Sequence, residues 1–370
     1  MRFAVNAAEA AVNAAEARTA VGNGSSPCEE LHTVIWKFAR RLKAANLHMM
    51  KQGLNLPGPD ILVPVAQRFW EMIRMLGDAE PLLNPGETGS IIQALQSLLG
   101  PWFWRCECWS KSRFKSYGYP GDFRILEILD GLEASAGRDP TRSGMENLLE
   151  ALYAGMPGTR GLWERRKWMK ATLWEEFRRK KGRLRILDIA GGGARYIRDF
   201  LAETPMPERL EIWIYDFDPA ASAYCGAIMP SLCNTSIRTV TKSLRKLDAE
   251  EFPGRFDVVI SAGLFDYLES GSAAKLLAKL HAAKAPDGVL AIANHHTQDP
   301  TRLVRSWLLE WPMQYRTAAQ VAELFPREAE AATALSPEGS LILACSRSRP
   351  SQGAPAPNAG CGLGTLSGPD

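Results

Sequence analysis

The 370-residue chain has no apolar run that approaches the ~18 residues a membrane-spanning helix needs. Its N-terminus lacks the basic and then apolar layout of a secretory signal, so we expect a cytoplasmic protein. A strong excess of charge is missing too, because 44 basic and 41 acidic residues leave a net charge of only +3. Neither a nucleic-acid nor a membrane partner is therefore predicted, and the expected partner is a small-molecule substrate. Nothing in the chain indicates an oligomeric state.

Metal-site and P-loop signatures are also missing. Cys106 and Cys108 form a Cys-x-Cys pair with no second pair nearby, so we expect no zinc, and no other spacing predicts a metal. No Gly-Lys-Ser/Thr follows a glycine-rich stretch, which excludes a P-loop nucleotide site.

Composition and periodicity divide the chain into four parts. Residues 1–26 contain the heptad Ala-Val-Asn-Ala-Ala-Glu-Ala twice and are predicted to be a frayed extension. Residues 27–182 have helical apolar spacing without strand-like alternation, which predicts an all-helical N-terminal or cap domain. From 183 to 346 strand and helix patterns alternate with short links, which predicts a doubly wound parallel α/β sheet. Residues 347–370, rich in Ser, Pro and Gly, are predicted to be a disordered tail.

The last predicted helix of the helical domain is strongly basic. Acidic residues interleave its cations, and helix C-termini favour positive charge, so we expect a solvated face rather than a nucleic-acid surface. The basic residues are Arg160, Arg165, Arg166, Lys167, Lys170, Arg178, Arg179, Lys180 and Lys181.

A glycine turn follows the first predicted strand of the sheet. The apolar run Leu184–Ile189 carries one acid, Asp188, and leads into three glycines and then a helical segment. Such a turn lets the backbone and the first helical N–H groups approach a ligand closely. Gly191 and Gly193 fit a dinucleotide fingerprint, but Tyr196 takes the place of its third glycine, which weighs against that interpretation.

The stretch Asp188-Ile-Ala190-Gly-Gly192-Gly-Ala194 resembles the acid-x-Gly-x-Gly-x-Gly pattern of class I S-adenosylmethionine (SAM)-dependent methyltransferases. The resemblance spans about residues 184–346. The acid and the middle glycine match, while alanines replace the outer two glycines. The resemblance implies a Rossmann-like methyltransferase sheet with SAM as cosubstrate or sole substrate, and no metal.

The resemblance also implies further SAM contacts. Asp216 ends the second predicted strand, 216 − 193 = 23 residues after the last glycine, where a carboxylate can accept both ribose hydroxyls. Residues after the third predicted strand would lie near the adenine, and the loop after the fourth would contact the methionine part. The predicted cofactor-binding residues are Asp188, Gly191, Gly192, Gly193, Asp216, Ser243, Leu244, Ala262, Gly263 and Tyr267.

Three short stretches resemble a bacterial subgroup often labelled 3-hydroxypalmitic acid methyl ester biosynthesis proteins. They are Tyr117-Gly-Tyr-Pro-Gly-Asp122, Gly263-Leu-Phe-Asp-Tyr-Leu268 and Ala293-Asn-His295. This narrower resemblance implies methyl transfer to a fatty carboxylate.

Four residues are catalytic candidates. Aromatic faces attract cations such as the SAM sulfonium, which suggests Tyr196 and Tyr119. Asp122 either caps a helix that starts beside it or helps Tyr119 to close the site. His295 follows the fifth predicted strand and is either a general base or a structural histidine; its neighbour His296 is the other candidate.

These residues leave three functions open. The favoured one is SAM-dependent methyl transfer to a small molecule in bacterial secondary metabolism or signalling, with a carboxylate as one candidate acceptor. The second is an azetidine-2-carboxylate synthase, in which the amino group of SAM attacks its own side chain and methylthioadenosine leaves. The third is a non-catalytic SAM-binding protein.

Overall fold

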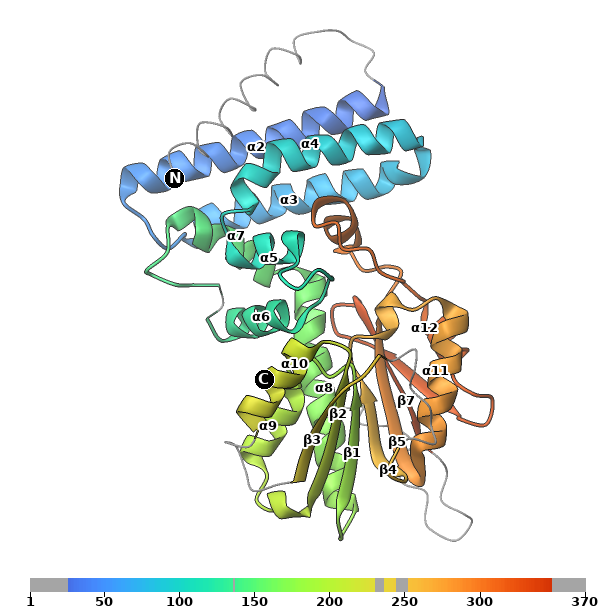
Figure 1. Ribbon diagram of the computed structural model, residues 1–370. Coiled ribbons are helices and arrows are strands. Elements are labelled where there is room, and N and C mark those ends of the chain that lie inside the picture. Colours follow the sequence, from blue (N-terminus) through green and yellow to red (C-terminus); the bar gives the residue numbers. More distant parts are fainter. Residues whose placement is uncertain (1–25, 136, 230–235, 244–251, 348–370) are drawn as a thin grey trace. The chain divides into compact units, whose positions relative to one another are not determined.

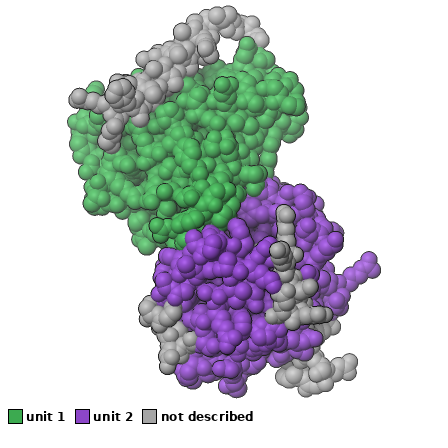
Figure 2. Space-filling view, in the orientation of Figure 1, with its two compact units in different colours: residues 1–159, 300–312 green, residues 160–299, 313–370 purple. Residues whose placement is uncertain are grey.

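The computed structural model describes residues 26–135, 137–229, 236–243 and 252–347. The predicted extension and tail, apart from Ser26 and Arg347, lie outside these residues, as does Leu244. The chain divides into two compact units, coloured separately in Figure 2. The helical unit comprises Met1–Thr159 with Pro300–Pro312, and the sheet unit comprises Arg160–Asp299 with Met313–Asp370.

The helical unit consists of helices that begin at strong sequence signals. Ser26, Asn84 and Ser143 each start a capping box, in which the side chain and a glutamate three residues on exchange bonds with the backbone. The helices are α2 (Pro27–Gln52), α3 (Pro59–Ala79), η1 (Glu80–Leu82), α4 (Pro85–Phe103), α5 (Glu107–Phe114), α6 (Phe123–Ser135) and α7 (Gly144–Ala154). Of these, α5 has too short an apolar repeat to be predicted from spacing.

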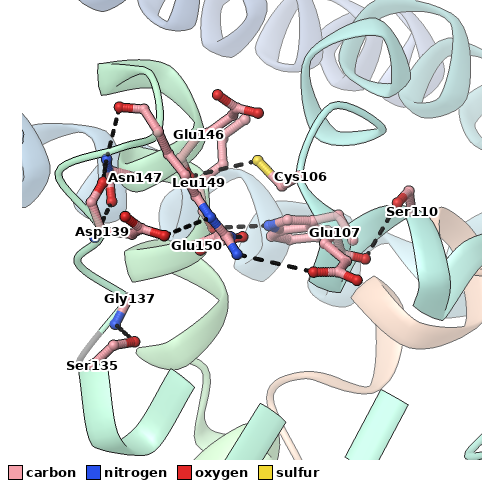
Figure 3. Close-up of polar contacts among 12 residues, drawn as sticks. Cys106, Glu107, Ser110, Ser135, Gly137, Asp139, Glu146, Asn147, Leu149 and Glu150 are labelled. Carbon is pink, nitrogen blue, oxygen red and sulfur yellow. Dashed lines mark hydrogen bonds and ion pairs between the residues drawn. The ribbon is translucent and has the colours of Figure 1, made fainter. Parts of the chain in front are cut away.

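Aromatic packing and one buried amide hold this unit together. The rings of Phe103 and Trp109 stack with centroids 4.1 Å apart, and both are fully buried. Figure 3 shows Asn147 of α7 beside Asp139, which lies on the connection between α6 and α7. The buried side chain of Asn147 accepts from the Asp139 N–H at 2.7 Å and donates to its carbonyl at 2.8 Å, which fixes that connection.

The described part of the sheet unit contains one seven-stranded sheet in the order β3-β2-β1-β4-β5-β7-β6. The first five strands run parallel, and β7 pairs antiparallel with both β5 and β6. This mixed sheet confirms the predicted Rossmann-like α/β class. The strands are β1 (Leu184–Ile189), β2 (Leu210–Asp216), β3 (Ser236–Thr241), β4 (Phe256–Ser261), β5 (Lys284–His295), β6 (Ala331–Leu335) and β7 (Leu341–Arg347).

Helices cover both faces of the sheet (Figure 1). In β1, Leu184 and Ile186 face a core built with α8, α9 and α10, while Leu187 and Ile189 face a core built with α11 and α12. The helices are α8 (Pro157–Arg179), α9 (Arg195–Glu203), η2 (Pro207–Arg209), α10 (Pro219–Ile228), η6 (Phe265–Tyr267), α11 (Ser270–Ala283) and α12 (Ala318–Ala322). No helix in the described ranges is both long and apolar enough to cross a membrane.

The observed division differs from the predicted boundary at 182/183 in two places. Most of α8 belongs with the sheet, because its buried side chains pack in the core with α9 and α10. Residues 300–312, which we call the returning segment, belong with the helices. Their π-helix η7 (Val304–Leu308) contacts α4, and the Trp307 carbonyl accepts from the Gln96 side chain at 3.2 Å.

Candidate functional site

The turn after β1 has a left-handed backbone at alternate residues. Ala190, Gly192 and Ala194 have φ of 56°, 54° and 45°. Glycine adopts this region freely, whereas an alanine there costs about 1–2 kcal/mol. The turn therefore keeps the conformation expected of a Gly-x-Gly-x-Gly pattern even though its outer two residues are alanines.

Gly191 is required for a different reason: neighbouring side chains lie too close to it to leave room for a Cβ atom. A Cβ on it would lie 2.6 Å from Asp188 Oδ2 and 2.7 Å from Ile214 Cγ2. The turn is further tied down by the Ala190 N–H, which donates to the Tyr215 carbonyl at 2.8 Å. Gly193 is buried within the turn.

Asp188 presents one occupied and one open carboxylate oxygen. The residue is fully buried, and its Oδ1 accepts from the Tyr196 hydroxyl at 2.5 Å. Its Oδ2 is buried and has no hydrogen-bond partner among the described residues. Burial raises the pKa of Asp188 to about 7, with the Tyr196 bond opposing that shift and the charge of Asp216 adding to it. An open, buried carboxylate oxygen of this kind is suited to receive a cation.

Tyr196 lies in the first turn of α9, only 6% exposed, and packs in the core shared with α8 and α10. Burial, followed by the charge and hydrogen bond of Asp188, raises the pKa of its hydroxyl well above the usual value. The hydroxyl therefore remains a proton donor to Asp188. The predicted contact of its ring with the sulfonium stays a prediction.

Asp216 closes the turn from the end of β2. Its Oδ2 accepts from the Gly192 N–H at 2.8 Å, and its Oδ1 accepts from the Asp218 N–H at 2.9 Å. Burial raises its pKa, and these backbone bonds oppose the shift. The Asp216 carbonyl also accepts from Lys242, which brings the exposed Ser243 to the same edge of the sheet. The ribose contact of Asp216 stays a prediction, now with the acid placed directly against the turn.

Arg165 is a site residue that the sequence did not reveal. It is 7% exposed, so the expectation of a solvated face is wrong for this residue. Its Nη1 donates to the Ala262 carbonyl at 3.1 Å, and a Cβ on Gly263 would lie 3.2 Å from the same nitrogen. Its position in the helical repeat could have predicted this burial. Arg165 lies on the same face of α8 as the buried residues Trp168, Met169, Thr172, Leu173, Glu176 and Phe177.

His295 ends β5 in a buried polar cluster and is 2% exposed. Its N–H donates to Asp266 Oδ1 at 2.6 Å, and its Nδ1 lies 3.2 Å from Asp299 Oδ2. Asp299 therefore orients the imidazole as the partner of a general base would. Tyr267, which directly follows Asp266 of this cluster, is 37% exposed. The catalytic role of His295 stays a prediction.

Residues 187–290 match the model of a family described as a methyltransferase domain. Over these residues the chain matches the methyltransferase family. The general resemblance is thereby confirmed, and the narrower bacterial subgroup stays a prediction. No curated protein sequence matches the chain.

Solved structures resemble the chain at low sequence identity. A Bordetella parapertussis protein described as a possible exported protein has a TM-score of 0.51 at 13% identity, over 88% of this chain and 97% of its own. The apo SAM-dependent methyltransferase SibL has a TM-score of 0.44 at 15% identity, over 86% and 97%. Magnesium protoporphyrin IX methyltransferase of Synechocystis PCC 6803, with S-adenosylhomocysteine bound, has a TM-score of 0.38 at 13% identity, over 51% and 86%. At 13% identity the first likeness concerns the fold alone.

A cavity of about 470 Å³ lies in the sheet unit that carries the methyltransferase domain. Tyr315 and Arg316 line it, and Tyr315 meets the His295 ring edge to face with centroids 6.2 Å apart. A cavity of this size can enclose a small molecule. No three His, Cys, Asp or Glu side chains gather as a metal site in the part of the chain that the structure describes.

Tyr119 and Asp122 belong to the helical unit rather than to the unit with the methyltransferase domain. Asp122 Oδ1 accepts from the N–H groups of Arg124 and Ile125 at 2.9 and 3.0 Å, which confirms its predicted alternative role as a helix cap. Gly121 has a φ of 73°, as the third position of a type II turn requires. The part of these two residues in closing the SAM site stays a prediction.

Proposed function

We propose that the protein transfers the methyl group of SAM to a small molecule. The observation that carries the proposal is the closed turn, in which Asp216 bonds the N–H of Gly192 between two left-handed alanines. This arrangement keeps the backbone of the glycine pattern and sets an acid beside it at the ligand-binding edge of the sheet.

The amino-acid end of SAM would bind between Asp188 and Arg165. That end is a zwitterion and needs an anion and a cation close together. Asp188 offers its unpaired oxygen to the ammonium. The positive charge of Arg165 acts near Asp188, because it lowers the pKa of Tyr196, the hydrogen-bond partner of Asp188, against the effect of burial. Ser261, at the end of β4, adds a buried hydroxyl with no partner among the described residues. These unsatisfied groups fit the ligand that the domain would hold.

The adenosine part would bind at the end of β2. A carboxylate has about four acceptor positions, so Asp216 can hold the two N–H groups and still accept from ribose hydroxyls. Phe217 follows it and is 51% exposed, an aromatic face of the kind that stacks on a base. Ser243 at the end of β3 supplies a further hydroxyl for the adenine edge.

Methyl transfer is an in-line displacement, so positioning supplies much of its acceleration. A carboxylate acceptor needs no base. An acceptor that arrives protonated would give its proton to His295, which Asp299 orients. The cavity of about 470 Å³ beside Tyr315 is large enough for a small acceptor.

Asp188 also supports a second candidate, the cyclisation of SAM to azetidine-2-carboxylate. In that reaction the α-amino nitrogen forms a bond to the side-chain carbon next to sulfur, the carbon–sulfur bond breaks, and methylthioadenosine leaves with the electron pair. The amine must first lose a proton. Asp188, whose buried carboxylate has a pKa of about 7, is suited to accept it.

One incubation separates the candidates. Purified protein is mixed with SAM alone, and products are followed by mass spectrometry. Methylthioadenosine with a four-membered amino acid supports cyclisation. No turnover until a small carboxylate or hydroxyl acceptor is added, and then S-adenosylhomocysteine, supports methyl transfer. Binding of SAM without turnover under any condition supports the non-catalytic alternative.

Asp216→Ala should weaken SAM binding roughly 100-fold, because it removes two charge-assisted hydrogen bonds to the ribose. Calorimetric titration measures the loss, and the melting temperature confirms that the variant is folded. Glu208→Ala is the matched control, since Glu208 is an exposed acid of the same unit. Unchanged affinity in Asp216→Ala would place the ribose elsewhere.

A further inference from the structure

A hydrogen bond between strand and helix spans the SAM turn. Asp188 lies on β1 and Tyr196 on α9, eight residues apart, and their side chains meet at 2.5 Å across the left-handed backbone. The bond occupies one oxygen of the carboxylate, and the other is buried and has no partner among the described residues. A bond of this kind fixes the direction in which the open oxygen points.

Charged and titratable groups surround the pair from every packed element. Asp216 faces Asp188 from the end of β2 and disfavours its negative charge. Arg165 faces Tyr196 from α8, and Cys225 faces it from α10. The Cys225 thiol donates to the Gly192 carbonyl at 3.0 Å, so it holds the turn rather than the carboxylate. Within this set, the Tyr196 hydroxyl is the group that stabilises the carboxylate form of Asp188.

We propose that Tyr196 is a positioning residue whose hydroxyl aims the open oxygen of Asp188 at the SAM ammonium, and that ligand binding releases a proton from this pair. The inference rests on the proposed function, and it assigns the hydroxyl rather than the ring of Tyr196 to the site. The only covalent bond broken in the step is the O–H bond of the protonated Asp188 carboxyl. A proton leaves Asp188 for solvent as the ammonium arrives.

The pH dependence follows from the free protein. Burial raises the pKa of Asp188 to about 7, so below that pH the free site holds a proton. The ammonium needs the carboxylate, so the proton must leave, and apparent affinity falls about tenfold per pH unit below the pKa. Above the pKa the carboxylate is already formed, and affinity becomes constant. Tyr196→Phe removes the bond that favours the carboxylate, so the midpoint should move to higher pH.

The experiment titrates S-adenosylhomocysteine into the full chain by calorimetry between pH 6 and pH 8, in two buffers of different ionisation enthalpy. The expected result is binding about tenfold weaker at pH 6 than at pH 8, with proton release at pH 6. Methylthioadenosine, which lacks the amino-acid end, should show neither effect. Asp188→Asn should bind S-adenosylhomocysteine weakly and without a pH dependence.

Tyr196→Phe separates the hydroxyl from the ring, because phenylalanine keeps the packing with α8 and α10. The proposal expects a pH midpoint above the wild-type value in this variant. A Tyr196→Phe profile identical to wild type overturns the proposal, as does a wild-type affinity that does not change with pH. Absence of S-adenosylhomocysteine binding at every pH would instead overturn the proposed function.

Discussion

Ala190 and Ala194 hold a left-handed backbone that glycine adopts without strain. Their methyl groups restrict the other backbone conformations that the turn could adopt. The left-handed conformation of an alanine lowers stability. We expect Ala190→Gly to raise the free energy of unfolding by about 0.5–1 kcal/mol, because the relief of about 1–2 kcal/mol exceeds the extra entropy of the unfolded glycine, about 0.5–1 kcal/mol. Urea denaturation measures the change.

The control for this substitution is Ala202→Gly, at an exposed position of α9. There the backbone is helical, so glycine should lower the free energy of unfolding by about 0.5–1 kcal/mol. Equal and negative effects at both positions would contradict the assignment of strain to the turn.

At the residue scale the sequence predicts acids well and buried cations poorly. Asp188 and Asp216 follow strands at recognisable spacing, so their place at the turn can be predicted. Arg165 lies in a run of basic residues, and only its phase on α8 distinguishes it from solvated neighbours. The hydrogen bond between Tyr196 and Asp188 spans a turn with a left-handed backbone at Ala190 and Ala194. A glycine pattern does not predict that conformation at alanine.

At the element scale, one arginine fastens the loop after β4 to the end of β5. Arg316 is 4% exposed, and its Nη1 donates to the Phe265 carbonyl at 2.8 Å and to Asn294 Oδ1 at 2.6 Å. Its Nη2 donates to the Leu268 carbonyl. The loop with Tyr267 and the strand end with His295 are therefore joined by this side chain, in addition to the bond from the His295 N–H to Asp266.

Arg316→Ala should lower the free energy of unfolding by at least about 3 kcal/mol, because three buried acceptors lose donors at about 1–3 kcal/mol each. Chemical denaturation measures the loss. Arg327→Ala, at an exposed arginine of the same unit, should stay within about 0.5 kcal/mol of wild type. If Arg316→Lys matches wild type in stability, the guanidinium geometry is not what fastens the loop.

Helices and strands can be predicted where the apolar periodicity is long and where residues typical of turns and helix caps mark the ends. The helix from Pro219 to Ile228 has a proline at its start and the capping residue Asp218 before it, signals that can be recognised in the sequence. Strand β5 begins at Lys284 and continues through Pro286-Asp-Gly288, a stretch whose residues favour a turn and do not predict a strand. The pairing of Lys284 with Phe256 before an irregularity in register keeps that stretch in the sheet.

At the scale of the whole molecule, the helical unit is discontinuous in sequence. The returning segment leaves β5 and supplies Val304, Trp307 and Leu308 to the core of the helical unit. Arg113 pairs with Glu310 at 2.5 Å and adds a polar anchor within that unit. The helical unit is therefore completed only by the returning segment, which follows Thr159 by more than a hundred residues in the sequence.

Replacing residues 300–312 by a short Gly-Ser link should destabilise the helical unit. Each of the three buried side chains contributes about 1.5–3 kcal/mol, so the loss should be several kcal/mol. Limited proteolysis should then cut the helical unit first. A Gly-Ser insertion beside Gly339, in the turn between β6 and β7, is the control and should leave the digestion pattern unchanged. Digestion of the sheet unit before the helices would contradict this assignment.

The discontinuity also sets an order of events on the ribosome. Residue 300 is added 300 − 159 = 141 residues after the first part of the helical unit is complete. At roughly 5–20 residues per second, the nascent helices wait roughly 7–30 seconds for the segment that completes their core. During that time the helical unit lacks Trp307 and its buried neighbours, so completion of the N-terminal unit depends on residues of the C-terminal half.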